Sequence, residues 1–168
     1  MFLLANEFTE IIQSGRTDHL SHSPAEQPGR VEDLASINDP VVHVTAGGYS
    51  VAALTAGHSI YAWGRPGFNS RGSHFLPNLD GVPNYIEVDG GKDVQDIALG
   101  ESHAICLATD GSIYVAGDNA SHQLGMDGEP KAALEEAWTK VDFQLPHGHK
   151  AVAVAAGAKT SFILTAES

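Results

Sequence analysis

The sequence predicts an all-β fold: an incomplete β-propeller built of about three four-stranded antiparallel blades. Three observations favour this class. One stretch of the chain recurs, its first two copies carry a hairpin signal, and 18 of the 168 residues are glycine, about 11% against a usual ~7%. Four-stranded units that recur every 40–50 residues or so are typical of propellers.

The repeat is written three times. Residues 41–64 (VVHVTAGGYSVAALTAGHSIYAWG) and 94–117 (VQDIALGESHAICLATDGSIYVAG) align without a gap, and residues 151–168 (AVAVAAGAKTSFILTAES) match the first part of both. The copies share two glycine positions, held by Gly47, Gly100 and Gly157 at the first and by Gly64 and Gly117 at the second. We therefore expect three repeat cores with one backbone path.

Each core reads as a series of short strands. An apolar strand ends at the first shared glycine, where we expect a tight turn or bulge that a side chain would obstruct. A second strand leads to Asp110-Gly111, a hairpin signal that predicts a turn with positive φ at both residues; Gly57-His58 suits a type II′ turn in the first copy. A third strand ends at the second glycine, and β-prone pieces such as residues 85–88 supply a fourth.

The other segments complete the predicted domain organisation. Residues 1–12 align with the end of a repeat, with Asn6 on Asn119, and predict a terminal blade strand; an amphipathic helix is the alternative. Residues 13–30 are rich in Ser, Pro, Gly and charge, which predicts a flexible loop. Residues 31–168 form the propeller-repeat domain, with a short helical insertion near 130–139, where good helix formers gather.

The second copy resembles the repeat of the regulator of chromosome condensation family. The matching residues are Gly100, His103, Leu107, Asp110, Gly111, Tyr114, Gly117, Asn119, Gln123, Leu124 and Gly125. The first copy keeps Tyr61-Ala62-Trp63-Gly64 and then departs from the pattern. The resemblance covers about residues 30–168 and implies a propeller in which the His103 position is structural.

The blade number has its own consequence. Family propellers usually carry about seven blades, so some three blades predict a fragment, a shortened gene product or an open array. An open array exposes strand edges, which predicts self-association through open blade edges.

The resemblance implies a non-enzymatic protein-interaction module that binds a protein partner through inter-blade loops. Arginine and aromatic residues dominate binding hot spots, and one inter-strand loop holds several of them. The predicted partner-binding residues are Arg65, Phe68, Arg71, His74 and Phe75. Guanine-nucleotide exchange, or other GTPase regulation by an assembled propeller, is the alternative that the family implies.

Charge and composition limit the classes of partner that the chain can bind. The formal net charge of −12 lacks the positive field that attracts nucleic acid or anionic membranes. No window approaches the ~20 apolar residues of a membrane span, and Cys106, the single cysteine, allows no internal disulfide and reads as a core residue. We expect an intracellular protein, cytoplasmic or nuclear.

The histidines are the candidate catalytic and metal-binding residues of the chain. A small His-dependent metal or hydrolytic enzyme would use His103 with nearby acids, yet the repeat assigns Asp110 to a hairpin turn. His19 and His22, and likewise His147 and His149, lack a third ligand placed by spacing. The sequence therefore predicts no catalytic residue, no metal and no cofactor.

Overall fold

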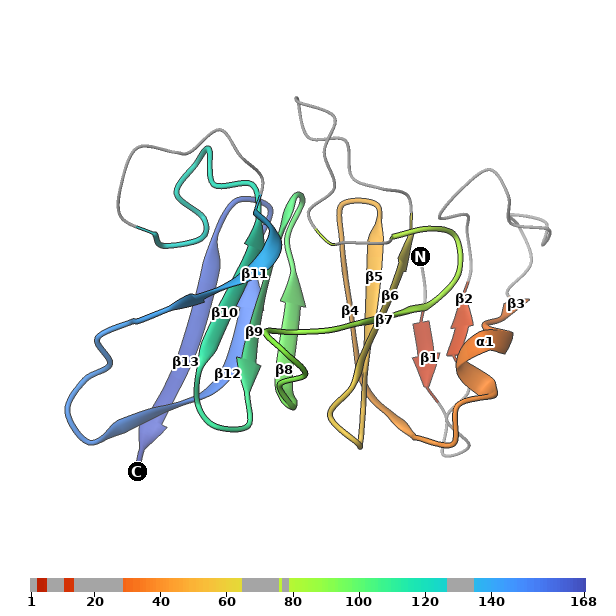
Figure 1. Ribbon diagram of the computed structural model, residues 1–168, viewed down its shortest axis with the longest axis horizontal. Helices are drawn as coiled ribbons and strands as arrows, with labels where there is room; N and C mark the ends of the chain where they lie inside the picture. Colours follow the sequence, from red (N-terminus) through yellow and green to blue (C-terminus); the bar gives the residue numbers. More distant parts are fainter. Residues whose placement is uncertain (1–2, 6–10, 14–28, 65–75, 77–78, 127–134) are drawn as a thin grey trace.

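The computed structural model describes residues 3–5, 11–13, 29–64, 76, 79–126 and 135–168. Over these residues the regular secondary structure is almost wholly β, arranged as four antiparallel sheets in a row (Figure 1). The elements, in chain order, are β1 (Leu3–Ala5), β2 (Ile11–Gln13), β3 (Gly29–Arg30), α1 (Glu32–Ala35), β4 (Val41–Gly47), β5 (Ser50–Thr55), β6 (Ile60–Gly64), β7 (Asn84–Ile86), β8 (Val94–Leu99), β9 (His103–Ala108), β10 (Ile113–Gly117), β11 (Glu135–Val141), β12 (His149–Ala156) and β13 (Ser161–Glu167).

Two of the sheets are complete blades, which confirms the predicted fold class. Strands β4-β5-β6-β7 form the first blade and β8-β9-β10-β11 the second, while β12 and β13 form the first two strands of a third. In all three copies the pairing of the first two strands shifts at the same repeat position, between Val41 and His43, Val94 and Asp96, and Ala151 and Ala153. The shared bulge shows that the three cores follow one backbone path.

The predicted helical insertion is wrong over residues 135–139, and residues 130–134 lie outside the described part of the chain. Strand β11 pairs with β10 across the registers Val115–Thr139 and Tyr114–Lys140, and the Trp138 side chain packs against the core between the first two blades. Helix propensity favours a helix there only weakly. The free edge of β10 supplies backbone hydrogen-bond partners, and pairing with them outweighs this weak helix propensity.

The predicted hairpin turns are also wrong in detail. Between β9 and β10 a positive φ occurs at Gly111 and not at Asp110, and between β5 and β6 at His58 and not at Gly57. The N–H of Gly111 bonds to the carbonyl of Ala108, and that of His58 to the carbonyl of Thr55. Each connection is therefore a turn followed by one left-handed residue, a common longer hairpin loop.

The blades pack face to face. One face of the first blade, including Ala52 and Leu54, is buried against Ile97 and Leu99 of the second. The opposite face of the second blade, with Ile105 and Leu107, packs against β12. In every blade we call the face that carries Ala52 and Leu54, or the residues at the same repeat positions, the forward face. We call the opposite face the backward face.

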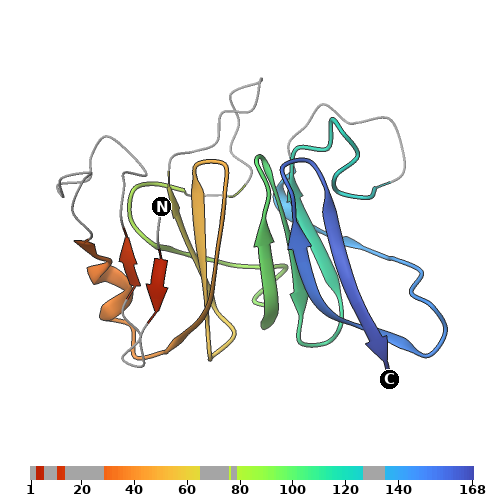
Figure 2. The same ribbon diagram turned by 180° about the vertical axis from the view of Figure 1, so that it is seen from behind.

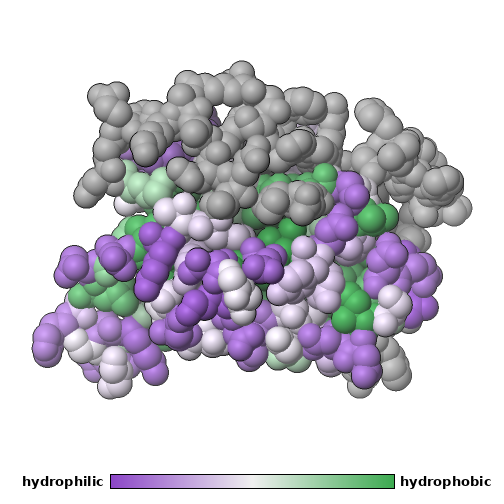
Figure 3. Space-filling model, viewed as in Figure 1, coloured by the Kyte–Doolittle hydropathy of each residue, from purple (hydrophilic) through white to green (hydrophobic). Residues whose placement is uncertain are grey.

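The two ends of the row lie far apart (Figures 1 and 2). Strands β1, β2 and β3 form a small sheet beside the first blade, and Leu34 of α1 is buried there against Val51, Ala53 and Trp63. Strand β13 lies at the opposite end. On the face seen in Figure 3 hydrophilic side chains cover most of the lower half, with smaller separate apolar groups among them.

Candidate functional site

The first shared glycine lets neighbouring blades approach closely. A Cβ on Gly100 would lie 2.7 Å from the carbonyl oxygen of Gly157 and would collide with the His103 ring; one on Gly47 would collide with the carbonyl of Gly100. None of the three glycines has a positive φ. Space between blades, and not turn conformation, is what Gly47 and Gly100 require, whereas a Cβ on Gly157 would meet the Thr160 hydroxyl of its own hairpin at 2.7 Å.

His103 is buried beside that contact. The side chain is fully inaccessible, and neither ring nitrogen has a hydrogen-bond partner among the described residues. Removal from water lowers the pKa of the His103 imidazole below its usual value. Ser50, which holds the same repeat position, is buried as well.

The structure does not bring His103 and Asp110 together. Asp110 lies in the turn at the far end of β9, seven residues or about 20 Å along an extended strand. There its carboxylate accepts a 2.8 Å bond from Lys92 Nζ and a 2.9 Å bond from the Ser112 N–H. The ammonium and this amide hold the pKa of the Asp110 carboxyl well below its usual range.

The loop that follows β10 is fixed by its own side chains. The Leu124 N–H donates to Asn119 Oδ1 at 2.9 Å, and Gln123 Nε2 donates to Asp118 Oδ2 at 3.2 Å. Left-handed residues at His122 and Gly125 close the loop, and Leu124 is buried. Residues 118–126 therefore form a rigid wall, which we call the exit loop.

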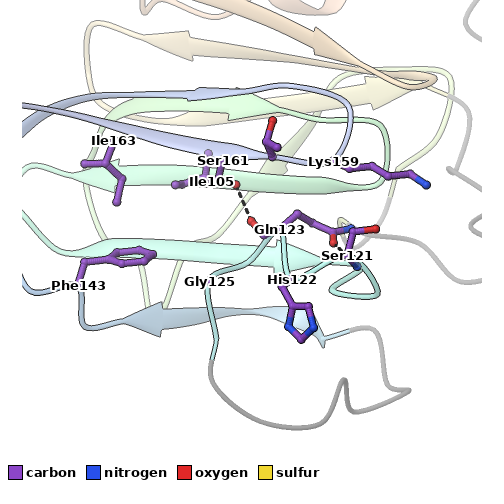
Figure 4. Close-up of a pocket in the computed structure, with 10 residues that line it drawn as sticks. Ile105, Ser121, His122, Gln123, Gly125, Phe143, Lys159, Ser161 and Ile163 are labelled. Atoms are coloured by element: carbon purple, nitrogen blue, oxygen red, sulfur yellow. Dashed lines mark hydrogen bonds between the residues drawn. The ribbon is translucent and has the colours of Figure 1, made fainter.

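A pocket of about 260 Å³ lies between the exit loop and β13 (Figure 4). Its lining residues are Ile105, Ser121, His122, Gln123, Gly125, Phe143, Lys159, Thr160, Ser161 and Ile163. Three of these residues, Ile105, Phe143 and Ile163, have large apolar side chains and come from three separate segments of the fold. The Ser161 hydroxyl donates to the carbonyl of Gln123 at 2.8 Å and ties β13 to the exit loop.

The strand beside this pocket has an open edge. Among the described residues β13 pairs with β12 alone, whereas β5 and β9, the same strand of the other blades, are paired on both sides. On its forward face Phe162 is 58% exposed and Leu164 is 63% exposed. Sequence reasoning predicted open blade edges but missed the pocket beside this one, because the pocket walls come from segments that lie far apart in the sequence.

The remaining predictions concern the contact loop, the histidines, metal binding and membrane spans. The predicted contact loop, with Arg65, Phe68, Arg71, His74 and Phe75, lies outside the described residues, as do His19 and His22. Within the described ranges no cluster of three or more His, Cys, Asp or Glu side chains could hold a metal ion. No helix in the same ranges is long and apolar enough to cross a membrane.

The fold and the repeat define a β-propeller repeat protein, and comparison with known proteins specifies the class. Residues 94–123 match the regulator of chromosome condensation (RCC1) repeat. The chain superposes on yeast RCC1 (Prp20), solved with Kap60, with a TM-score of 0.77 at 15% identity over 98% of this chain and 40% of that one. For human WBSCR16 the TM-score is 0.73 at 19% identity, over 97% and 42%. The chain thus carries RCC1 repeats in a propeller fold, as its second copy predicted.

Curated relatives share the repeat over part of their length. The human E3 ubiquitin-protein ligase HERC2 is 33% identical over 118 residues, which are 69% of this chain and 2% of that protein. The ultraviolet-B receptor UVR8 of Arabidopsis thaliana is 28% identical over 153 residues, 90% of this chain and 33% of the receptor. The chain therefore spans a small part of HERC2 and about a third of UVR8.

Proposed function

We propose that the chain is a non-enzymatic protein-interaction module of the RCC1-repeat type, which binds a protein partner beside its inter-blade loops. The observation that carries this proposal is the pocket between the exit loop and β13, with an apolar floor beside an open strand edge. Concave sites that combine apolar walls with a few polar groups are the usual binding sites of proteins.

The open edge indicates how a partner would bind. An extended segment laid along β13 would satisfy the strand's outward N–H and C=O groups, and one of its alternate side chains would enter the pocket. Main-chain bonds then supply affinity, and the pocket supplies selectivity. The floor formed by Ile105, Phe143 and Ile163 fits an apolar side chain.

The rim favours an acidic residue next to that apolar one. Lys159 and His122 are the basic side chains of the pocket lining, in a chain whose formal net charge is −12. Because the surrounding field repels acids, a local cation selects where an acidic residue can approach. We therefore propose a partner segment that alternates apolar and acidic residues.

Direct binding tests this proposal. A displayed library of short extended peptides is selected on the full chain, and affinities of the selected peptides are measured by fluorescence polarisation. Phe143→Ala and Lys159→Glu should each weaken binding by about 10-fold, roughly 1.4 kcal/mol. Lys150→Glu, an exposed charge reversal on β12, is the matched control and should change affinity by less than about 2-fold. Failure to select any peptide, or equal losses in all three variants, would contradict the proposal.

The arginine-aromatic loop is tested separately, as a second contact for a whole protein partner. Replacing Arg65, Phe68 and Arg71 together by alanine should weaken binding of a folded partner without changing peptide affinity in the pocket. Equal binding of the folded partner by the triple variant would remove the loop from the proposal.

GTPase regulation remains the alternative, favoured by the structural likeness to Prp20p, whose reported binding partners include Gsp1p and histones. Release of a fluorescent guanine nucleotide from a Gsp1p-type GTPase discriminates the two. A binding module leaves the release rate unchanged, and an exchange factor accelerates it.

A further inference from the structure

We infer that the contact between the second blade and the β12–β13 hairpin is a pH-sensitive switch, which closes around the neutral His103 ring and opens when that ring takes up a proton. We call this contact the His103 seam; it consists of the start of β9, Gly100 and the turn at residues 157–160. The switch goes beyond the proposed function and needs no ligand. It rests on the burial of His103, on the groups around its ring, and on the same repeat position in the first blade.

The His103 ring is enclosed where the two sheets meet. Its side chain is fully inaccessible to water, and it lies two residues before Ile105, on the face that packs against β12. The ring lies so close to Gly100 that a Cβ there would collide with it, and the same Cβ would meet the Gly157 carbonyl of the hairpin. The ring therefore cannot reach water while the hairpin and the blade stay in contact.

Neither nitrogen of the ring is satisfied in this closed arrangement. Nδ1 and Nε2 of His103 are both buried without a hydrogen-bond partner among the described residues. A buried polar atom without a partner costs free energy, and a buried charge without a partner costs considerably more. The closed seam therefore tolerates the neutral ring and opposes the protonated one.

The charged and titratable side chains around the ring come from each of the elements that enclose it. Glu101 follows β8, Asp118 follows β10, His122 belongs to the exit loop and Lys159 lies in the β12–β13 turn. Glu101, His122 and Lys159 are exposed, so water screens their charges. Asp118 is half-buried, and its charge favours a protonated ring.

Burial outweighs the influence of Asp118. The Asp118 carboxylate accepts a bond from Gln123 Nε2 at 3.2 Å and another from the Ala120 N–H at 3.1 Å, so these groups already compensate part of its charge. Asp118 and the Thr160 backbone raise the pKa of the His103 imidazole less than removal from water lowers it. The ring is therefore neutral in the closed seam and protonates more readily once the seam opens.

The contact between the first two blades lacks this feature. There Ser50 holds the repeat position of His103 and is buried in the same way. A serine hydroxyl stays uncharged between pH 5 and pH 8, whereas histidine changes its charge in that range. The contact between the first two blades should therefore stay closed at a pH that opens the His103 seam, and it provides an internal control.

The hairpin is attached to the second blade without strand pairing, because β8-β9-β10-β11 and β12-β13 are separate sheets. Across the seam the Glu101 N–H donates to the Ala158 carbonyl at 3.1 Å, and the Val154 N–H donates to the Asp96 carboxylate at 2.8 Å. Contacts of this kind can open locally while the sheets on either side stay folded. The amides of Glu101 and Val154 therefore report on the seam.

The opening has a defined sign. Below about pH 6.5, each unit of pH should raise the fraction of open seams by up to about 10-fold, until the ring of the closed seam also takes up a proton. Thr160 and Ser161 also line the pocket, so opening should weaken peptide binding at low pH. This last consequence alone rests on the proposed function.

Hydrogen exchange of the unaltered chain at pH 7 and pH 5, where carboxylates remain ionised, tests the switch. Corrected for the intrinsic effect of pH, protection of the Val154 and Glu101 amides should fall at least about 5-fold at pH 5. The fall should persist in dilute denaturant, since an opening that exposes little surface responds weakly to it. The Leu99 amide, which donates to Thr45 across the first contact at 3.3 Å, should show no such denaturant-insensitive opening.

Three results of this experiment would overturn the inference. The first is unchanged protection of Val154 and Glu101 at pH 5. The second is a loss that occurs only through unfolding of the whole chain, and the third is the same denaturant-insensitive opening at Leu99. A chain that binds no peptide would remove the proposed function and leave the opening of the seam as it is.

Two variants assign the pH dependence to one imidazole. His103→Thr removes the titrating group and should reduce the difference in Val154 protection between pH 7 and pH 5 to less than about 2-fold. His147→Gln replaces an exposed histidine between β11 and β12; it is the matched control and should retain the full difference. Persistence of the difference in His103→Thr, or its loss in His147→Gln, would contradict the assignment. The unaltered chain decides whether the seam opens even where a variant fails to fold.

Discussion

At the scale of single residues, the repeat glycines and their neighbours set how closely the blades approach. Gly100 is constrained by two different neighbours, since a Cβ there would meet both the His103 ring and the backbone of the next blade at Gly157. The ring belongs to a side chain that can be replaced, whereas the carbonyl belongs to the backbone. The two contacts can therefore be separated by mutation.

Gly100→Ala should destabilise the chain by about 1–3 kcal/mol, the usual cost of overpacking a close contact. Adding His103→Thr, the residue type that the third copy has at Thr160, removes the ring contact and should recover part of the loss but not all of it. Chemical denaturation of both variants measures the difference. Full stability of Gly100→Ala alone would show that the blades are not in close contact there.

The buried His103 predicts a pH dependence. Its folded-state pKa lies below the usual value of about 6.5, so the unfolded chain binds the proton first. Above pH ~6.5 this group should not lower the free energy of unfolding. As the pH falls below ~6.5, the free energy of unfolding should decrease by at most about 1.4 kcal/mol per pH unit from this group. His103→Thr, compared by denaturation at several pH values, should lose that component. An identical pH profile for both chains would contradict the burial of the imidazole.

Cys106 provides a third residue-level check. The thiol is fully buried, and its burial raises the pKa of the Cys106 thiol far above its usual range. Because the thiolate is the reactive form, a thiol reagent at pH 8 should leave the native chain unmodified and label it fully in denaturant. Rapid labelling of the native chain would place Cys106 outside the core.

At the scale of elements, inter-blade contacts decide how firmly the half-blade β12–β13 is held. The Asp96 carboxylate on β8 accepts a 2.8 Å bond from the Val154 N–H on β12, and its other oxygen accepts one from the Ile97 N–H. This side chain spans the gap between two sheets that share no strand. A buried amide that loses such a partner is costly to leave unsatisfied.

Asp96→Ala should therefore loosen β12 and β13 while leaving the first blade unchanged. We expect faster hydrogen exchange in the half-blade and a loss of about 1–3 kcal/mol. Asp96→Asn keeps one acceptor oxygen and should have a smaller effect. Uniform changes across both complete blades would show that Asp96 does not act at this contact.

The elements also show what local sequence could predict. The recurring Gly100, the apolar runs and the Asp110-Gly111 turn predicted the blades, because each signal acts within one hairpin. The helix expected near residues 130–139 was wrong where β11 begins, because a distant strand edge, and not local propensity, decides its conformation. The hairpin at Gly57-His58 was misjudged for a related reason: an additional residue in the loop moves the left-handed position to His58.

The candidate site was less predictable than the fold. Asn119 and Gln123 were recognised as part of the repeat, but their role in holding the exit loop appears only once Leu124 and Asp118 are placed beside them. The pocket joins Phe143, Ile105 and Ile163 from three separate segments. The spacing of residues within one segment cannot predict which side chains of separate segments come together.

At the scale of the whole molecule, the row of sheets presents two unlike ends. One end carries inner strands without outer ones, and the other carries a small sheet aligned with outer strands. A free strand edge is a ready template for pairing, so we expect association through the edge of β13. The like charges of the copies oppose this association at low salt.

Hydrogen exchange of the full chain, followed residue by residue as a function of protein concentration, tests the central claim that β13 is an open strand awaiting a partner. The outward-facing amides of β13 should exchange rapidly in dilute solution and slow as concentration rises or as a selected peptide is added. Amides at the same repeat positions in β9 should stay protected throughout. Protection of β13 equal to that of β9 at every dilution, with no partner present, would contradict the account.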